Sequence, residues 1–295
     1  MKILLNILLV LNSWQVLASA DKSEFSGIIS LDQTGCSASL VRLKEFNIKN
    51  ALVLTNGHCL GGYIEPNKTI INLNLKKPKK LYTGLPTKIA ARLSSGLSAG
   101  LFDNNGILRT SIDVTRIVYA TMTKTDIALI ELNKTYKEIR NRYGIEPYVL
   151  SQEGPGVGEN IIILSGYGKK KFKCSIENIA GRVEESKWYW LSSIGYSEEC
   201  NVQTGTSGSP IISERTGEVI GVNNSVNQDG NKRGKACSLN NPCEVFDNGE
   251  VIVKKGKGYG QNTHWIYDCL SHTLKNRVKF NPKRERCLLP FPRQE

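Results

Sequence analysis

The amino-acid sequence predicts an all-β protein with a helix near its C-terminus. Short runs rich in Val, Ile, Leu and Tyr recur along the chain, and clusters of Gly, Pro, Asn and Ser separate them as turns separate strands. The 27 glycines and only two methionines suit a protein of strands and tight turns. With 295 residues, of which 40% are hydrophobic, the chain is long enough for two modest domains or for two barrels that share an interface.

The N-terminus has the pattern of a secretory signal peptide. Met1 and Lys2 precede an apolar stretch at residues 3–10, and small residues at 18–20 mark a cleavage site. The apolar stretch is too short to cross a bilayer, and no later apolar run is long enough for a membrane helix. We therefore expect a secreted or periplasmic protein that is cleaved after Ala20 and has no membrane span.

All eight cysteines lie beyond this cleavage site, and an even number of cysteines in an exported chain indicates disulfide bonds. A zinc site would need close pairs of ligands, but only Cys237 and Cys243 are near neighbours and no second such pair exists. The sequence therefore predicts disulfides, no metal and no cofactor.

The chain is strongly basic, with a formal net charge of +12 that becomes +11 when Lys2 leaves with the signal peptide. Such an excess can attract nucleic acid, anionic membranes or acidic glycans. No helix-turn-helix, zinc-finger or aromatic-basic motif accompanies the charge. We expect a basic surface with at most weak polyanion binding, and no specific nucleic-acid partner.

The first half of the chain reads as strands joined by loops. The predicted strand segments are 25–30, 37–43, 51–55, 107–120 and 127–132. Loops are expected at 76–80, a basic run broken by proline, and at 94–106, which is rich in Ser, Gly and Asn.

The second half continues the β pattern. Residues 134–144 are charged and have room for a turn of helix, and 153–159 form a loop rich in Gly. Further strands are predicted at 161–168, 188–191, 218–225 and 258–261. The apolar residues near the end are spaced for one helix face; they are Trp265, Ile266, Leu270 and Leu274. A basic tail follows.

The chain is organised around residues 205–210, with the sequence Gly-Thr-Ser-Gly-Ser-Pro. Small residues on both sides of Ser207 allow a sharp turn that exposes its hydroxyl beside free backbone N–H groups. An acyl-transfer enzyme needs this combination of an exposed nucleophile and donors that face the developing oxyanion. Gly and Ser clusters are more often plain turns, so the motif gains its weight from two other stretches.

A serine nucleophile needs a base within hydrogen-bond reach, and the chain holds three histidines. His58 follows the strand at 51–55 on a Gly-containing turn and adjoins a cysteine. His264 and His272 fall on the predicted last helix, where surface or packing roles are the default. His58 is therefore the candidate base.

The candidate acid is Asp126, because it opens an apolar strand. Asp103 lies in a loop-like turn, and neither it nor Asp113 is followed by so apolar a strand. The order of His58, Asp126 and Ser207 along the chain resembles that of the secreted trypsin/chymotrypsin-like serine proteases.

This resemblance implies a fold of two six-stranded antiparallel β-barrels with a C-terminal helix. Residues 1–20 are then the signal peptide, and 21–140 form the N-terminal barrel with the His and Asp. Residues 141–276 form the C-terminal barrel, which carries the Ser, together with the helix, and 277–295 form a basic C-terminal extension.

The resemblance also implies a role for each site residue. His58 is the general base, Asp126 accepts a hydrogen bond from its far ring nitrogen, and Ser207 attacks the scissile carbonyl to give an acyl-enzyme. The backbone N–H groups of Gly205 and Ser207 form the oxyanion hole.

A disulfide between Cys36 and Cys59 is likewise implied, and it would fix the loop that carries His58. The other six cysteines allow fifteen pairings. Cys269–Cys287 and a link from Cys200 to Cys174 or Cys237 are the candidates.

Two departures from the family concern specificity and activation. Trypsin-type relatives have an aspartate where this chain has Asn201, and a neutral amide cannot supply the charge that Lys or Arg wants. Asn223, Asn224 and Ser225 make the pocket wall polar. Thr206 stands where relatives carry the acid that pairs with a freed N-terminus, so another group must order the oxyanion loop.

The sequence thus predicts a secreted, monomeric serine endopeptidase that acts on proteins or peptides with a specificity unlike that of trypsin. One alternative is an α/β-hydrolase, but Ser209 breaks its motif and the chain lacks alternating helices and strands. The other is an inactive protease-like module that binds proteins or polyanions. Intact candidates at all three triad positions argue against it.

Overall fold

The computed structural model describes residues 25–76, 88, 90–91, 95–103, 105–273 and 276–290. The predicted signal peptide at 1–20 and most of the predicted loop at 76–80 lie outside the described residues, as does Leu274. Strands dominate the described part of the chain. Within it, no helix has the length and apolar character that a membrane crossing requires.

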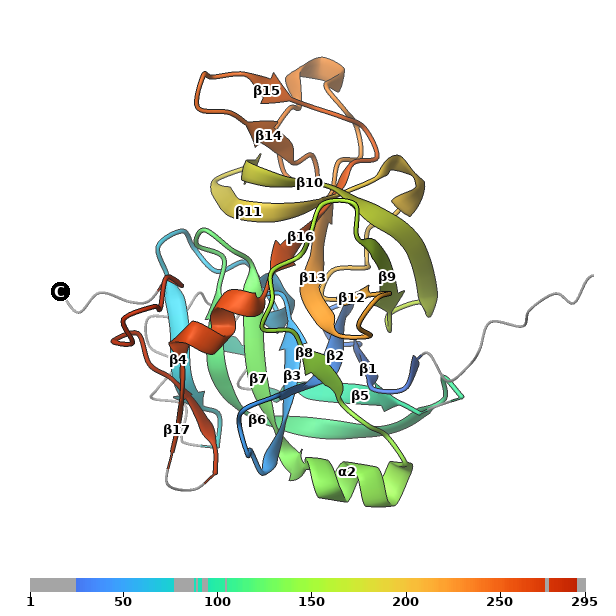
Figure 1. Ribbon diagram of the computed structural model, residues 1–295, viewed down its shortest axis with the longest axis vertical. Coiled ribbons are helices and arrows are strands. Elements are labelled where there is room, and N and C mark those ends of the chain that lie inside the picture. The colour runs from blue at the N-terminus through green and yellow to red at the C-terminus, as the bar shows by residue number, and fades with distance from the viewer. Residues whose placement is uncertain are drawn as a thin grey trace, which may run out of the picture.

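Six antiparallel strands close into a barrel in the first half of the chain, in the lower part of Figure 1. They are β1 (Ile28–Leu31), β2 (Cys36–Leu43), β3 (Asn50–Thr55), β5 (Ser98–Phe102), β6 (Leu108–Thr121) and β7 (Ile127–Thr135). The ring closes because β1 pairs with β2 on one side and with β5 on the other. β4 (Thr69–Asn74) pairs with β6. Buried side chains such as Leu40, Val53 and Ile130 fill one cluster in this half.

A second ring of six antiparallel strands lies above the first in Figure 1. It consists of β9 (Asn160–Ser165), β10 (Lys170–Glu185), β11 (Trp188–Tyr196), β12 (Pro210–Ser213), β13 (Val219–Val226) and β16 (Gly258–Asn262). Here β13 closes the ring by pairing with both β12 and β16. Ile163, Ile194 and Ile211 are fully buried in its core. The predicted two-barrel fold is therefore confirmed.

One short strand joins the two barrels into a continuous sheet. β8 (Tyr148–Leu150) pairs in parallel with β2 of the first barrel and with β13 of the second. It follows α2 (Tyr136–Tyr143), which forms in the charged segment at 134–144. Thr135 and Glu138 make a capping box that satisfies the first N–H groups of this helix.

The expected C-terminal helix is a six-residue 3-10 helix at His264–Cys269 and is shorter than the apolar spacing suggested. Leu270 is fully buried but begins β17 (Leu270–His272) instead of continuing the helix. Ile266 and Leu270 pack into the same cluster between a helical turn and a strand end, so their spacing did not require a longer helix.

The chain then turns back along the first barrel. β18 (Val278–Phe280) pairs with β17, and the Phe280 ring stacks on Tyr119 of β6 with centroids 4.3 Å apart. Arg277 forms an ion pair with Glu131 of β7, a fully buried carboxylate that also binds Arg116. The C-terminal extension thus leaves the second barrel and packs against the first.

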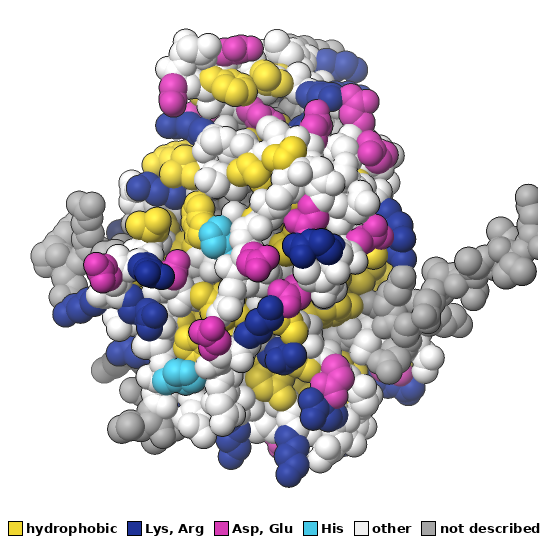
Figure 2. All heavy atoms as spheres, in the orientation of Figure 1, with side chains coloured by type: hydrophobic (Ala, Val, Ile, Leu, Met, Phe, Trp, Pro, Cys, Tyr) yellow, Lys and Arg dark blue, Asp and Glu magenta, His cyan; other side chains and the backbone are white. Residues whose placement is uncertain are grey.

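All eight cysteines form disulfides, and such bonds indicate an extracellular or periplasmic location. The pairs are Cys36–Cys59, Cys174–Cys200, Cys237–Cys243 and Cys269–Cys287. The Cys237–Cys243 pair lies in an insertion between β13 and β16 that also holds β14 (Cys243–Val245) and β15 (Val251–Ile252), at the top of Figure 1. Figure 2 shows basic and acidic side chains interspersed over one face of the molecule.

Candidate active site

The turn that carries His58 is closely packed and is held by a disulfide. β3 ends at Thr55, and His58 begins a 3-10 turn three residues later. At Gly57, between them, an added Cβ would lie 2.2 Å from the carbonyl oxygen of Thr121, so no side chain fits. The Cys36–Cys59 disulfide fixes the next residue to β2.

Two hydrogen bonds join His58 to the carboxylate of Asp126. The ring Nδ1 of His58 lies 2.7 Å from Oδ2 of Asp126, and the backbone N–H of His58 donates to Oδ1 at 3.1 Å. The Asp126 side chain is 1% exposed. Asn56 donates to its backbone carbonyl at 2.7 Å, and Gln261 accepts from its N–H at 3.3 Å. The carboxylate therefore holds the imidazole in one tautomer, with the proton on Nδ1 and Nε2 free to accept.

The surroundings raise the pKa of His58. Burial by itself lowers it, because the charged imidazolium loses water. The charge and hydrogen bond of Asp126 outweigh burial, and the charge of Glu185 adds to them. The site thus stabilises the protonated imidazole that forms when the histidine takes a proton.

The loop with Ser207 is held between the two barrels. The carbonyl oxygen of Ser207 accepts a bond of 2.8 Å from the N–H of Ser37 in β2, and the N–H of Gly208 donates to Asn223 in β13 at 2.9 Å. Gly208 has a φ of +81°, and an added Cβ would lie 2.0 Å from the Ser37 carbonyl oxygen. The hydroxyl of Ser207 donates to the carbonyl oxygen of Asn224 at 3.0 Å.

His58, Asp126 and Ser207 line the same cavity, whose volume is about 50 Å³. Three distant segments of the chain thus meet at one place. The rival acid Asp103 is bound to Arg109 and to nearby N–H groups of its own loop, so its role is to order that loop. His264 bonds to Asn262, and His272 stacks on Phe46.

The amides beside the serine are available as donors. Among the hydrogen bonds of the described residues, none uses the backbone N–H of Gly205 or of Ser207. These are the two amides expected to bind an oxyanion.

The side chain of Asn223 orders the loop at Thr206, which stands at the position of the family's acid. Its Nδ2 donates to both the carbonyl oxygen and the hydroxyl of Thr206, each at 3.0 Å. Its Oδ1 accepts from the buried Tyr196 hydroxyl at 3.1 Å. The amide of Asn223 therefore links the loop at Thr206 to Tyr196 of β11, a connection that sequence alone did not reveal.

A second cavity of about 40 Å³ also has Ser207 in its wall and is lined mainly by neutral polar residues. Asn223, Asn224 and Ser225 contribute to its wall. Asn201 is not among its lining residues: it follows a 3-10 turn with a φ of +45°, is exposed, and bonds to the Glu199 carbonyl oxygen. Gln203 and Thr204 line this cavity, and a substrate-binding role for Asn201 stays a prediction.

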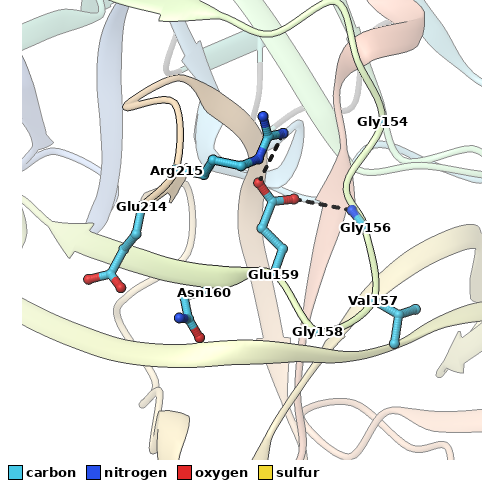
Figure 3. Close-up of a pocket in the computed structure, with 8 residues that line it drawn as sticks. All are labelled: Gly154, Gly156, Val157, Gly158, Glu159, Asn160, Glu214 and Arg215. Carbon is cyan, nitrogen blue, oxygen red and sulfur yellow. Dashed lines mark hydrogen bonds and ion pairs between the residues drawn. The ribbon is translucent and has the colours of Figure 1, made fainter.

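A larger hollow, of about 660 Å³, lies elsewhere (Figure 3). Its walls are the loop 154–160 and residues 214–215. Glu159 accepts from the N–H of Gly156 at 3.2 Å and faces Arg215 at 3.9 Å. None of the candidate catalytic residues lines this hollow.

Sequence reasoning missed Glu185, which lines the catalytic cavity at the end of β10. Burial raises the pKa of Glu185, although hydrogen bonds from Ser225 and Asn240 and the charge of His58 oppose it. Its partner Asn240 comes from the insertion after β13, and no pattern in the sequence links the two. A metal site finds no support here: the described cluster of His58 with Cys36 and Cys59 has both sulfurs in a disulfide.

The two closed barrels define the architecture of the chymotrypsin-like serine proteases. Residues 36–222 match the family model of the trypsin-like peptidase domain, which is more than half of the chain. The chain therefore belongs to the trypsin-like peptidase family.

Three similar solved structures are remote in sequence. The MamO protease domain from Magnetospirillum magneticum is 11% identical, with a TM-score of 0.47, over 84% of this chain and 98% of its own. The active form of the Rv3671c protease from M. tuberculosis is 13% identical, with a TM-score of 0.43, over 82% of this chain and 77% of its own. A Glu endopeptidase is 15% identical, with a TM-score of 0.39, over 84% of this chain and 89% of its own. A comparison with curated proteins finds no match.

Proposed function

We propose that this protein is an exported serine endopeptidase in which His58, Asp126 and Ser207 form the catalytic triad. The observation that carries the proposal is the 2.7 Å bond between His58 Nδ1 and Asp126 Oδ2 in the cavity that Ser207 also lines. This bond leaves Nε2 of the imidazole as the proton acceptor.

The proposed reaction begins when the Ser207 hydroxyl turns from the Asn224 carbonyl oxygen toward Nε2 of His58. The oxygen attacks the scissile carbonyl as its proton passes to the imidazole, and Asp126 stabilises the imidazolium. The N–H groups of Gly205 and Ser207 bind the oxyanion. His58 then gives the proton to the leaving amine, and water hydrolyses the acyl-enzyme by the reverse steps.

The proposed specificity differs from that of trypsin. The cavity beside Thr206 offers amides and hydroxyls from Gln203, Thr204 and Asn223, and none of the described residues that line it is charged. A pocket of this composition suits a small or polar neutral side chain at the cleavage point.

The proposed organisation keeps the boundaries expected from the sequence. A signal peptide at 1–20 directs export, 21–140 and 141–276 form the barrels that meet at the site, and 277–295 extend the chain. The four disulfides support an exported, disulfide-stabilised enzyme.

Fluorophosphonate labelling followed by peptide mapping tests the proposal. The secreted protein should be modified at Ser207 alone, and Ser207→Ala should abolish both the label and hydrolysis of a protein substrate. Ser271→Ala, in β17, is the matched control and should label normally. The alternative of an inactive binding module predicts no label on the folded wild-type protein.

A further inference from the structure

The catalytic cavity contains a carboxylate that the triad does not use. Glu185 is 5% exposed and lies at the end of β10, where it faces the cavity shared by His58 and Ser207. Its Oε2 accepts from the Ser225 hydroxyl at 2.5 Å, and its Oε1 accepts from the N–H of Asn240 at 2.7 Å. A carboxylate has about four acceptor sites, so these two bonds leave capacity for further donors.

No ion pair among the described residues includes Glu185, and His58, whose charge acts on Glu185, is paired with Asp126. The lining of the cavity includes no Lys or Arg, and its second carboxylate, Asp126, is already paired with His58. The nearby Lys187 is paired with Glu65 instead. A buried carboxylate without a cationic partner is costly, and a cation that enters the cavity relieves that cost.

The walls of the cavity suit a cation with an apolar stem. Trp188 and Trp190 are buried aromatic walls, and aromatic faces attract ammonium and guanidinium groups. Tyr63 and Leu239 line the rim and are 44% and 41% exposed. The cavity volume of about 50 Å³ has room for a head group only, so the stem of a long side chain would cross this rim.

Two residues that line the same cavity carry buried donors without a hydrogen-bond partner among the described residues. These donors are the indole Nε1 of Trp190 and Nδ2 of Asn224. Buried donors are normally satisfied, and peptide carbonyl oxygens are suitable acceptors for both.

The two cavities beside Ser207 also fit an extended peptide. They share Ser207, Asn224, Ser225 and Asn240 and otherwise have different linings. Successive side chains of an extended strand point to opposite sides. A strand that crosses Ser207 therefore directs one side chain into the neutral cavity and an adjacent one into the cavity with Glu185.

We propose that Glu185 makes this second cavity a recognition site for a Lys or Arg side chain of the substrate, next to the neutral residue at the cleavage point. The role rests on the proposed function for the register of the substrate. The substrate class is then a peptide with a basic residue adjacent to a polar or small one.

Binding to the catalytically silent Ser207→Ala protein tests this role without turnover. The probes are short peptides of Ala and Gln with one arginine at each position in turn, and matched peptides with citrulline, which keeps the shape of arginine without its charge. Isothermal titration calorimetry should show one position at which arginine binds roughly 10- to 100-fold more tightly, the factor that a hydrogen bond to a charged group is worth. Adding Glu185→Gln should remove the difference, while the neighbouring Glu184→Gln should retain it.

Three outcomes would overturn the proposal. These are equal binding of arginine and citrulline peptides at every position, an arginine preference that survives Glu185→Gln, and its loss in Glu184→Gln. The comparison of the two peptide sets needs no variant at residue 185, so a folding defect of Glu185→Gln leaves the test intact. A protein that labels at Ser207 but ignores the charge refutes this role alone, whereas an arginine preference without labelling refutes the peptidase alone.

Discussion

Replacing Asn223 with Ala tests whether this amide orders the oxyanion loop in place of a charged pair. The change removes both bonds to Thr206, each 3.0 Å long, and leaves the buried Tyr196 hydroxyl without its acceptor. Two lost hydrogen bonds and one unsatisfied hydroxyl together cost about 2–4 kcal/mol of stability. The loop should then lose the arrangement in which the N–H of Gly205 faces the oxyanion, and loss of such a donor lowers the rate roughly 100- to 1000-fold.

The assay compares rates of fluorophosphonate labelling and peptide hydrolysis with the melting temperature. Tyr196→Phe is the matched control, because it removes the bond to Oδ1 of Asn223 but leaves both bonds to Thr206. It should lose stability and keep most of its rate. If Asn223→Ala melts earlier yet labels as fast as the wild type, Asn223 supports the core only and the reasoning about the loop is wrong.

Three further predictions concern the acid, the pH profile and the C-terminal extension. Asp126→Asn should lower kcat by about 10⁴ while the fold survives, since the amide favours the wrong tautomer of His58; a loss of only a few-fold in steady-state kinetics would argue against the triad. His58 must be neutral to act as a base, so kcat/KM should fall as the pH falls through the raised pKa of His58. Glu185→Gln removes the charge of Glu185, one cause of that raised pKa, so the acid limb of the pH profile should move to lower pH. An acid limb that does not move would contradict the coupling between Glu185 and His58. Burial raises the pKa of Glu131, but its bonds to Arg277 and Arg116 outweigh burial and lower it, so its contribution to stability is present above the unfolded pKa and is lost as the pH falls through the folded one. Arg277→Ala should therefore cost about 1–3 kcal/mol in urea unfolding at neutral pH and less in acid, with hydrolysis unchanged, whereas a cost that does not vary with pH would show that the ion pair is not its source.

The fold was predictable because its strands leave strong local signals and its motifs fall at their ends. The runs at 51–55 and 127–132 become β3 and β7, and they deliver His58 and Asp126 to the same end of the first barrel. The length of the C-terminal helix was overestimated: it is a short 3-10 helix at His264–Cys269. Apolar residues at helical spacing pack equally well from a turn followed by a strand. Only tertiary pairing through Cys269–Cys287 and β18 decides between the two.

The pocket residues were less predictable than the candidate triad. Asn201 was selected because trypsin-type relatives have an aspartate at this position, but Asn201 has a left-handed backbone and is not among the residues that line the cavity, which include Gln203 and Thr204. Glu185 gave no local signal, because its importance depends on contacts with Ser225 and with Asn240 from a distant insertion. Contacts between segments far apart in the chain cannot be read from local pattern.

The path of the last residues has a consequence for how the molecule unfolds. The extension at 277–295 follows β17, which comes after the last strand of the second barrel, and it is fastened to the first barrel through Arg277 and through the Tyr119–Phe280 stack. Neither half can open widely without releasing this strap, and the hydroxyl of Tyr119 also donates to the Pro290 carbonyl oxygen near its end. The two halves should therefore melt in a single cooperative transition. Cutting the chain before Arg277 should replace this single transition with two.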